Sequence, residues 1–152
     1  MFEQIIAFLQ EKGIDFRTLE HAPTLTSEDS ARERGEDISI GGKALLLKVD
    51  KTFHLFVLSA AFKLDSNAIK KYFKAKKLRF ATREELMEMT GLVPGSVPPF
   101  GRPFVDFDLY VDTSIIQNER IAFNAGSLTN SVIMSVKDYQ QLSQPMVFTF
   151  SK

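Results

Sequence analysis

Apolar residues recur along the chain with two different periods, and each period predicts a different kind of element. Beginning at Phe2 they recur at helical spacing, and Gly13 is suited to the left-handed end of a helix, so we expect a helix over residues 2–12. Two strongly apolar runs, KALLLKVD and TFHLFVLSA, meet at Asp50 and Lys51 and predict a β-hairpin.

Short polar segments between the apolar runs carry the signals with which helices begin. A Ser or Thr followed three residues later by an acid resembles a capping box, in which both side chains bond free backbone amides. Such pairs predict helices that start after Thr26, Thr82 and Ser135 and end near Gly35, Gly91 and Leu142. Asp65 is suited to cap a basic helix that continues to about Phe73.

Further strands are predicted at residues 15–21, 78–81, 104–112, 114–117, 120–126 and 146–150. Strands therefore outnumber helices and do not alternate regularly with them. This order favours an α/β fold of the α+β type, with a mixed or mostly antiparallel sheet and peripheral helices, over a doubly wound fold. The chain shows no repeat and no linker, so we expect a single domain over residues 1–152.

The composition is typical of a globular protein and excludes several kinds of functional site. The chain has 152 residues, of which 44% are apolar and 25% charged. The absence of cysteine excludes disulfides, thiolate metal sites and thiol nucleophiles. The amphipathic N-terminus does not resemble a secretory signal, and no apolar run approaches the ~20 residues that span a bilayer, so we expect a cytoplasmic protein.

Positive charge is concentrated in one segment although the net charge is zero. Seven basic residues and a single acid lie between Lys63 and Arg79. The segment is either a solvated helix face or a surface that attracts a polyanion. Its candidate contacts are Lys70, Lys71, Lys74, Lys76 and Lys77.

The usual catalytic motifs are missing. His21 and His54 are the only histidines, without the spacing of a zinc site, and we expect neither a metal nor another cofactor. His54 lies within an apolar strand, which favours a structural role. A Ser-His-Asp triad has no GxSxG elbow to support it, and GGKALLLK lacks the phosphate-loop pattern.

Lys43 opens an apolar strand face that period two extends through Leu45, Leu47 and Val49. It either reaches solvent at the strand end or lies at the mouth of a pocket. In a pocket, its ammonium could bind phosphate or an oxyanion, and partial burial would lower its pKa.

Two loops have compositions suited to a binding site. In GLVPGSVPPFG, residues 91–101, prolines restrict the backbone while glycines allow close approach, and Phe100 offers a flat face for stacking. The segment FNAGSLTNSV could present backbone amides to a ligand, or it could be an ordinary hairpin turn. The candidate binding residues are Gly91, Pro94, Gly95, Ser96, Phe100, Gly101, Asn124, Gly126 and Ser127.

Taken together, KALLLK, GLVPGSVPPFG and FNAGSLTNSVIMSVKDY resemble the YbaK/prolyl-tRNA-editing family of aminoacyl-tRNA deacylase domains. LYVD at 109–112 matches a strand of such proteins, and the resemblance covers essentially the whole chain. It implies a partly barrel-like mixed sheet with peripheral helices. It also implies hydrolysis of the ester on a mischarged tRNA, with a small amino acid on tRNA-Pro or a similar tRNA, by water assisted by a substrate ribose hydroxyl.

The resemblance also implies roles for particular residues. Lys43 falls on the lysine that orients the tRNA 3′ end, the loop around Gly91, Pro94 and Gly95 lines the aminoacyl pocket, and the lysine-rich segment is a candidate tRNA contact. Asp138 lies where relatives carry an acid. Leu128 departs from the pattern, because many relatives have His in this segment. Either that His is dispensable, or this protein prefers a different amino acid, or its hydrolytic activity is weak.

Two alternatives remain open. The same pocket could belong to a non-catalytic module that binds aminoacyl-tRNA or an amino acid and docks on an aminoacyl-tRNA synthetase. It could also serve a hydrolase or binder of small molecules, for which the lysine-rich segment would be dispensable.

Overall fold

The strands form two sheets in the computed structural model, which describes residues 1–24 and 26–152. The larger sheet is mixed and has the order β4–β2–β3–β5–β8. Its strands are β2 (Gly42–Val49), β3 (Thr52–Ser59), β4 (Leu78–Phe80), β5 (Leu109–Asp112) and β8 (Met146–Phe148). The smaller sheet is antiparallel, with the order β1–β7–β6, and comprises β1 (Phe16–Glu20), β6 (Arg120–Asn124) and β7 (Asn130–Ser135).

The predicted hairpin of β2 and β3 is at the centre of the larger sheet, and both of its faces are buried. Leu55 and Val57 of β3 face a core that they share with residues of the smaller sheet, such as Phe123. Phe56 and Leu58 alternate with them and face a second cluster beneath α3 (Ser66–Phe73). Burial on both faces explains why this run is apolar at consecutive positions.

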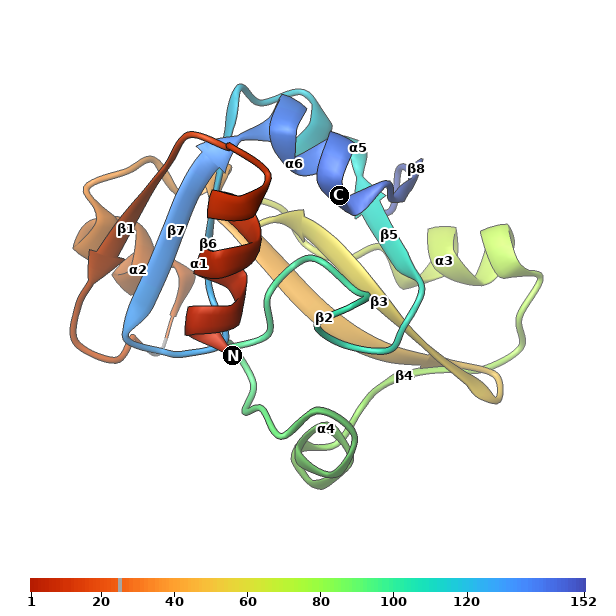
Figure 1. The fold of residues 1–152 in the computed structure, drawn as a ribbon. Helices are drawn as coiled ribbons and strands as arrows, with labels where there is room; N and C mark the ends of the chain where they lie inside the picture. Colours follow the sequence, from red (N-terminus) through yellow and green to blue (C-terminus); the bar gives the residue numbers. More distant parts are fainter. Residues whose placement is uncertain (25) are drawn as a thin grey trace.

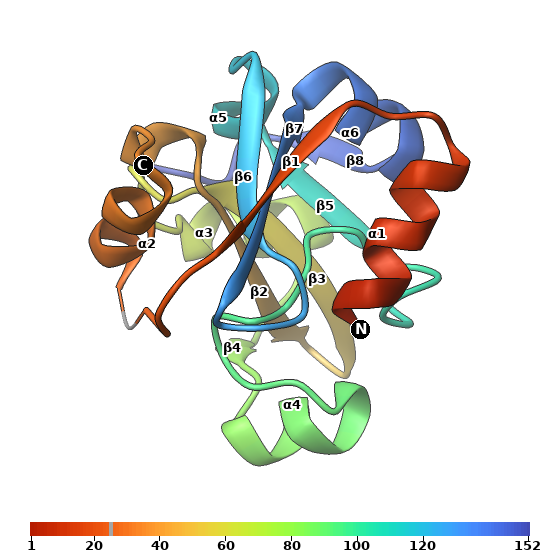
Figure 2. The ribbon, with the colours of Figure 1, turned by 60° about the vertical axis from the view of Figure 1, so that its left-hand side comes forward.

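Helices cover the sheets from several sides (Figure 1). Besides α3 they are α1 (Phe2–Glu11), α2 (Ser27–Arg34), α4 (Arg83–Thr90), α5 (Thr113–Ile116) and α6 (Val136–Ser143), and a 3₁₀ turn spans Ile38–Ile40. Helices α1 and α2 flank the smaller sheet on opposite sides, and α4 projects from the rest of the fold (Figures 1 and 2). None of the helices in the described residues is long and apolar enough to cross a bilayer.

The predicted helix starts are confirmed. The hydroxyls of Thr26, Thr82 and Ser135 each accept a hydrogen bond from the backbone amide three residues later, and Asp65 caps α3 in the same way. At α4 the reciprocal bond from the Thr82 amide to Glu85 completes a capping box. These caps fix where the polar helices begin.

The predicted mixed α/β fold with peripheral helices is confirmed, as two sheets that form no closed barrel in the part of the chain that the structure describes. Some predictions about single strands are wrong. Residues 114–117 do not form a strand, because the buried Asp112 carboxylate accepts the Ser114 amide at 2.9 Å and starts α5. Residues 104–108 form turns before β5. Strand β7 was not predicted; it lies between β1 and β6 and forms the middle of the smaller sheet.

Candidate functional site

A pocket with a volume of about 180 Å³ opens where both sheets meet the Pro/Gly loop. Its walls come from Thr24, Thr26 and helix α2, the start of β2, Ala60 directly after β3, the Pro/Gly loop and the end of β6. The lining residues are Thr24, Thr26, Ser27, Ser30, Arg34, Gly41, Gly42, Lys43, Ala44, Leu45, Ala60, Gly95, Val97 and Asn124. Three predicted site residues from distant parts of the sequence, Lys43, Gly95 and Asn124, therefore line the same cavity.

Lys43 lies near the start of β2, where the strand pairs with Leu58 of β3. Its side chain is half-buried, and its Nζ donates a hydrogen bond to the Phe62 carbonyl at 3.2 Å. Burial lowers the pKa of Lys43, and attraction to Glu28 partly offsets this effect. Lys43 is thus a cation in the pocket wall and not a fully solvated strand-end lysine.

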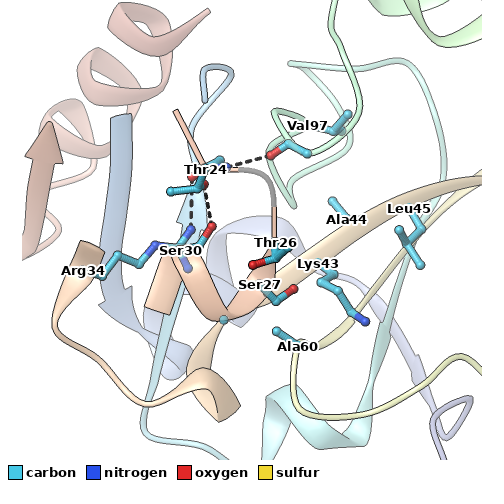
Figure 3. A pocket seen from close by; sticks show the side chains of 14 residues that line it. Thr24, Thr26, Ser27, Ser30, Arg34, Lys43, Ala44, Leu45, Ala60 and Val97 are labelled. Carbon is cyan, nitrogen blue, oxygen red and sulfur yellow. Dashed lines mark hydrogen bonds between the residues drawn. The ribbon is translucent and has the colours of Figure 1, made fainter. Parts of the chain in front are cut away.

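Arg34, the last residue of α2, is a pocket residue that the sequence analysis missed. Its Nε donates to Ser131 Oγ at 2.9 Å and its Nη2 to Asn124 Oδ1 at 3.1 Å. Burial lowers the pKa of Arg34 to about 10, so the guanidinium remains charged at neutral pH. Arg34 and Lys43 lie on opposite sides of the pocket (Figure 3).

The Pro/Gly loop is attached to its neighbours by three hydrogen bonds. Asn124 Nδ2 donates to the Gly95 carbonyl at 2.8 Å, and the Gly126 amide donates to the Ser96 carbonyl at 2.9 Å. The hydroxyl of the fully buried Tyr139 donates to the Pro99 carbonyl at 2.5 Å. Because these bonds hold the loop along its length, Gly95 and Val97 form a fixed wall of the pocket.

Comparison with known proteins matches residues 21–142 to the aminoacyl-tRNA editing domain. The chain belongs to this family. It is 31% identical to the multifunctional Ser/Thr-tRNA deacylase ProXp-y of Escherichia coli, over 99% of this chain and 92% of that protein. It is 24% identical to the prolyl-tRNA editing protein ProX of Acetoanaerobium sticklandii, over 97% of this chain and 93% of that protein.

The fold of this editing domain is also found in solved structures. A crystal structure of a candidate trans-editing enzyme for prolyl-tRNA synthetase superposes with a TM-score of 0.85 at 23% identity. The match covers 99% of this chain and 96% of the other. At this level of identity the likeness establishes the mixed α/β fold alone.

Four more of the predicted binding residues lie in the Pro/Gly loop but do not line the pocket. Gly91 ends α4 in a left-handed conformation and is exposed, as is Pro94. Ser96 is buried, and its hydroxyl bonds the Val93 carbonyl at 2.7 Å within a turn. Gly101 has φ +71, and a Cβ there would lie 3.0 Å from the Phe107 carbonyl oxygen. Their contacts shape the loop itself.

The prediction that Phe100 offers a stacking face is wrong. Its side chain is only 2% exposed and lies in the main core. Its ring packs edge-on against Phe8, Phe123 and Tyr139. A ring enclosed in this way has no face for a nucleobase, because the apolar packing that holds the loop down also covers Phe100.

The turn between β6 and β7 is closed by its own contacts. Ser127 Oγ accepts the Thr129 amide at 3.0 Å and the Asn130 side-chain amide at 3.1 Å, as in an ordinary polar turn. A Cβ on Gly126 would overlap Met1, so this glycine makes room for the N-terminus. Leu128 lies beside the loop, 3.4 Å from the position of a Cβ on Gly95, so residue 128 is next to the pocket wall.

The predicted lysines lie far from the pocket. Lys70 and Lys71 are in the last turn of α3, and Lys74 follows it. The backbone amides of Lys76 and Lys77 donate to Asp50 Oδ1 at the tip of the β2–β3 hairpin, at 3.0 and 2.9 Å. Pocket and lysines are therefore at opposite ends of the hairpin.

Neither histidine lines the pocket. His21 Nε2 is 2.8 Å from Ser131 Oγ, which links His21 to the hydrogen bonds of Arg34. His54 stacks on Phe73, and burial lowers its pKa. Asp138 provides the backbone amide that Ser135 caps. No group of three or more His, Asp or Glu side chains in the described residues could hold a metal ion.

Proposed function

We propose that this protein is a cytoplasmic trans-editing aminoacyl-tRNA deacylase that acts as a single editing domain over residues 1–152. Its substrate is the ester between a mistakenly attached small amino acid and the terminal adenosine of tRNA-Pro or a similar tRNA. The observation that carries the proposal is the pocket in which Lys43, Gly95 and Asn124 meet. Family membership and the names of the E. coli and A. sticklandii relatives support it.

The size of the pocket supports a small amino acid. At about 180 Å³ it is smaller than the pockets of roughly 300–1,000 Å³ that enclose drug-sized ligands. Small side chains are those that synthetases discriminate least well, because one methylene contributes only about 1–3 kcal/mol, and a second site then removes the errors.

Each part of the pocket has a role in this proposal. Lys43 binds and orients the 3′ end of the tRNA with its half-buried ammonium. The wall at Gly95 and Val97 encloses the amino acid, and its fixed position limits the ordering cost of binding. Water attacks the ester carbonyl with help from a ribose hydroxyl of the substrate, so no side chain acts as nucleophile.

The hydroxyl groups of the pocket indicate which small amino acids to test. Thr24, Thr26, Ser27 and Ser30 all contribute to the lining, and Thr24 Oγ1 and Ser30 Oγ are 2.7 Å apart. A polar lining suits a side chain that bears oxygen. We therefore include seryl and threonyl esters among the proposed substrates, in line with the name of the E. coli relative.

A deacylation panel over mischarged tRNAs tests the proposal. We expect wild-type protein to release seryl, threonyl or alanyl groups, and Lys43→Ala to lower kcat/KM by roughly 10-fold or more, the usual scale for a charge-assisted contact. Lys48→Ala is the matched control, because Lys48 is on the same strand, outside the pocket lining, with its Nζ over the Phe53 ring.

Two outcomes would contradict the enzyme proposal. The first is a wild-type protein as inactive as Lys43→Ala on every substrate. The second is binding of an aminoacyl-adenosine analogue without turnover of any ester, which would indicate the non-catalytic binding module, including one that docks on a synthetase.

A further inference from the structure

The Arg34 guanidinium places positive charge in the pocket wall without a paired acid. The pocket lining includes Arg34 and Lys43 and no carboxylate. Arg34 makes none of the ion pairs found among the described residues, and its side-chain partners Asn124 and Ser131 are both neutral. Buried charges in proteins are normally paired, because desolvation of an unpaired ion is costly. A partly buried guanidinium without an ion-pair partner in a cavity wall is therefore suited to a ligand.

Arg34 also retains donors for such a ligand. A guanidinium has five N–H groups in a planar fork, and those on Nε and Nη2 already bond Ser131 and Asn124. Nη1 makes no hydrogen bond to a described residue. It lies 3.6 Å from where a Cβ of Gly41 would be, and Gly41 is itself part of the lining. The N–H groups of Nη1 are thus at the pocket, and the bonds from Nε and Nη2 fix the plane of the guanidinium.

The chemistry of the substrate limits what Arg34 can contact. A guanidinium repels the α-ammonium of an amino acid and only donates hydrogen bonds, so its partner on the substrate must be an acceptor atom such as a hydroxyl oxygen. Asn124 bonds both Arg34 Nη2 and the Gly95 carbonyl, and Gly95 is on the wall assigned to the amino acid. Lys43 lies on the other side of the pocket (Figure 3).

We infer that Arg34 determines amino-acid specificity by donating a hydrogen bond from Nη1 to the side-chain oxygen of a hydroxylated amino acid. The inference rests on the proposed function for the location of the amino acid, and it adds the residue that distinguishes serine from alanine. An alanyl group leaves the donor unpaired, which is the arrangement by which polar sites reject analogues that lack a hydroxyl.

Binding of two non-hydrolysable analogues separates this role from catalysis. The probes are 3′-deoxyadenosine derivatives with a seryl or an alanyl group joined through a 3′-amide, measured by isothermal titration calorimetry. Wild-type protein should prefer the seryl probe by roughly 10- to 100-fold, the range for a hydrogen bond to a charged group. Arg34→Met should abolish the preference. Arg32→Met, at an exposed residue of the same helix paired with Asp29, should retain it.

The ratio of the two affinities is the decisive quantity, because a purely structural defect would weaken both probes equally. Equal weakening in Arg34→Met, or equal binding of both probes by wild-type protein, would overturn the inference. Arg34→Lys keeps a positive charge without the fork and should reduce the preference in a folded protein, as checked by thermal melting. If the probes are discriminated but no ester is hydrolysed, the proposed deacylase activity fails while the role of Arg34 stands.

Discussion

At the residue scale, glycines of the same loop serve different purposes. Gly95 lines the pocket and has a left-handed backbone with φ of +87, and a Cβ there would be in ordinary contact with Leu128 at 3.4 Å. Gly91 and Gly101 both have left-handed backbones, with φ of +74 and +71, but they differ in their surroundings. Around a Cβ on Gly91 the space is open to 4 Å, whereas a Cβ on Gly101 would be 3.0 Å from the Phe107 carbonyl oxygen and 3.3 Å from Leu109 Cβ.

Alanine at these two positions should therefore have unequal effects. Gly91→Ala should lower the free energy of unfolding by about 1–2 kcal/mol, the cost of a left-handed conformation with a Cβ. Gly101→Ala carries the same cost and should lower the free energy of unfolding by about 1–3 kcal/mol more than Gly91→Ala does, because the neighbouring backbone must move. Urea denaturation measures both, and equal decreases would show that the packing at Gly101 relaxes freely.

At the element scale, α4 depends on local polar contacts more than on burial. It projects from the fold, and Leu86 is its one buried residue (Figure 2). Glu85 accepts the Thr82 amide and forms a two-bond pair with Arg79 of β4, at 2.8 and 3.0 Å. These contacts lower the pKa of Glu85 from its ordinary value of 4.5 to about 2, with the Arg79 hydrogen bonds as the largest cause.

The stabilisation from Glu85 should depend on pH in a defined window. Because the pKa is lower in the folded state, the contribution is complete above about pH 4.5 and disappears as the pH falls toward 2. Glu85→Gln keeps a side-chain oxygen for the cap and removes the charge. Its melting temperature should be below that of wild type at pH 7, and the gap should close between pH 4.5 and 2.

Glu88→Gln is the control for this titration, since Glu88 is exposed on the same helix and outside the capping box. A gap that persists unchanged at pH 2, or one of equal size in the Glu88 variant, would show that the Arg79–Glu85 pair does not stabilise α4.

At the scale of the whole molecule, the pocket and the lysine-rich segment are separated by the length of the central hairpin. The pocket is lined by the first residues of β2, whereas Lys76 and Lys77 bond the hairpin tip beyond Val49. The strand itself, seven residue steps at about 3.3 Å each, is roughly 23 Å long. Figure 1 shows α2, beside the pocket, and α3 at opposite sides of the fold. A small ligand in the pocket cannot reach these lysines, whereas a tRNA with its 3′ end in the pocket is long enough to do so.

Replacing Lys74, Lys76 and Lys77 with Gln should therefore weaken tRNA binding and leave small ligands unaffected. We expect the slope of log K against log salt to become shallower by about 0.7–0.9 for each phosphate that the variant no longer neutralises. Affinity for the seryl-amide adenosine probe should stay the same. An unchanged salt slope would mean that the lysines are a solvated face, and the tRNA would have to bind elsewhere on the protein.

The sequence by itself determined the elements whose causes are local. Caps at Thr26, Thr82 and Ser135 were predictable because a cap involves residues within one helical turn. The β2–β3 hairpin was predictable because its apolar runs are adjacent. The resemblance to an editing domain also came from contiguous motifs, and it included Lys43, Gly95 and Asn124, which line the pocket.

Only the tertiary structure decided which side chains are enclosed and by what. β7 was missed because its place in the sheet depends on pairing with β1 and β6, which its own residues do not encode. Phe100 was misjudged and Arg34 was missed for the same reason. An aromatic residue in an open-looking loop is covered by three distant rings, and an arginine at the end of a polar helix is partly buried against residues about 90 positions away. Burial arises from such long-range packing, and local sequence cannot specify it.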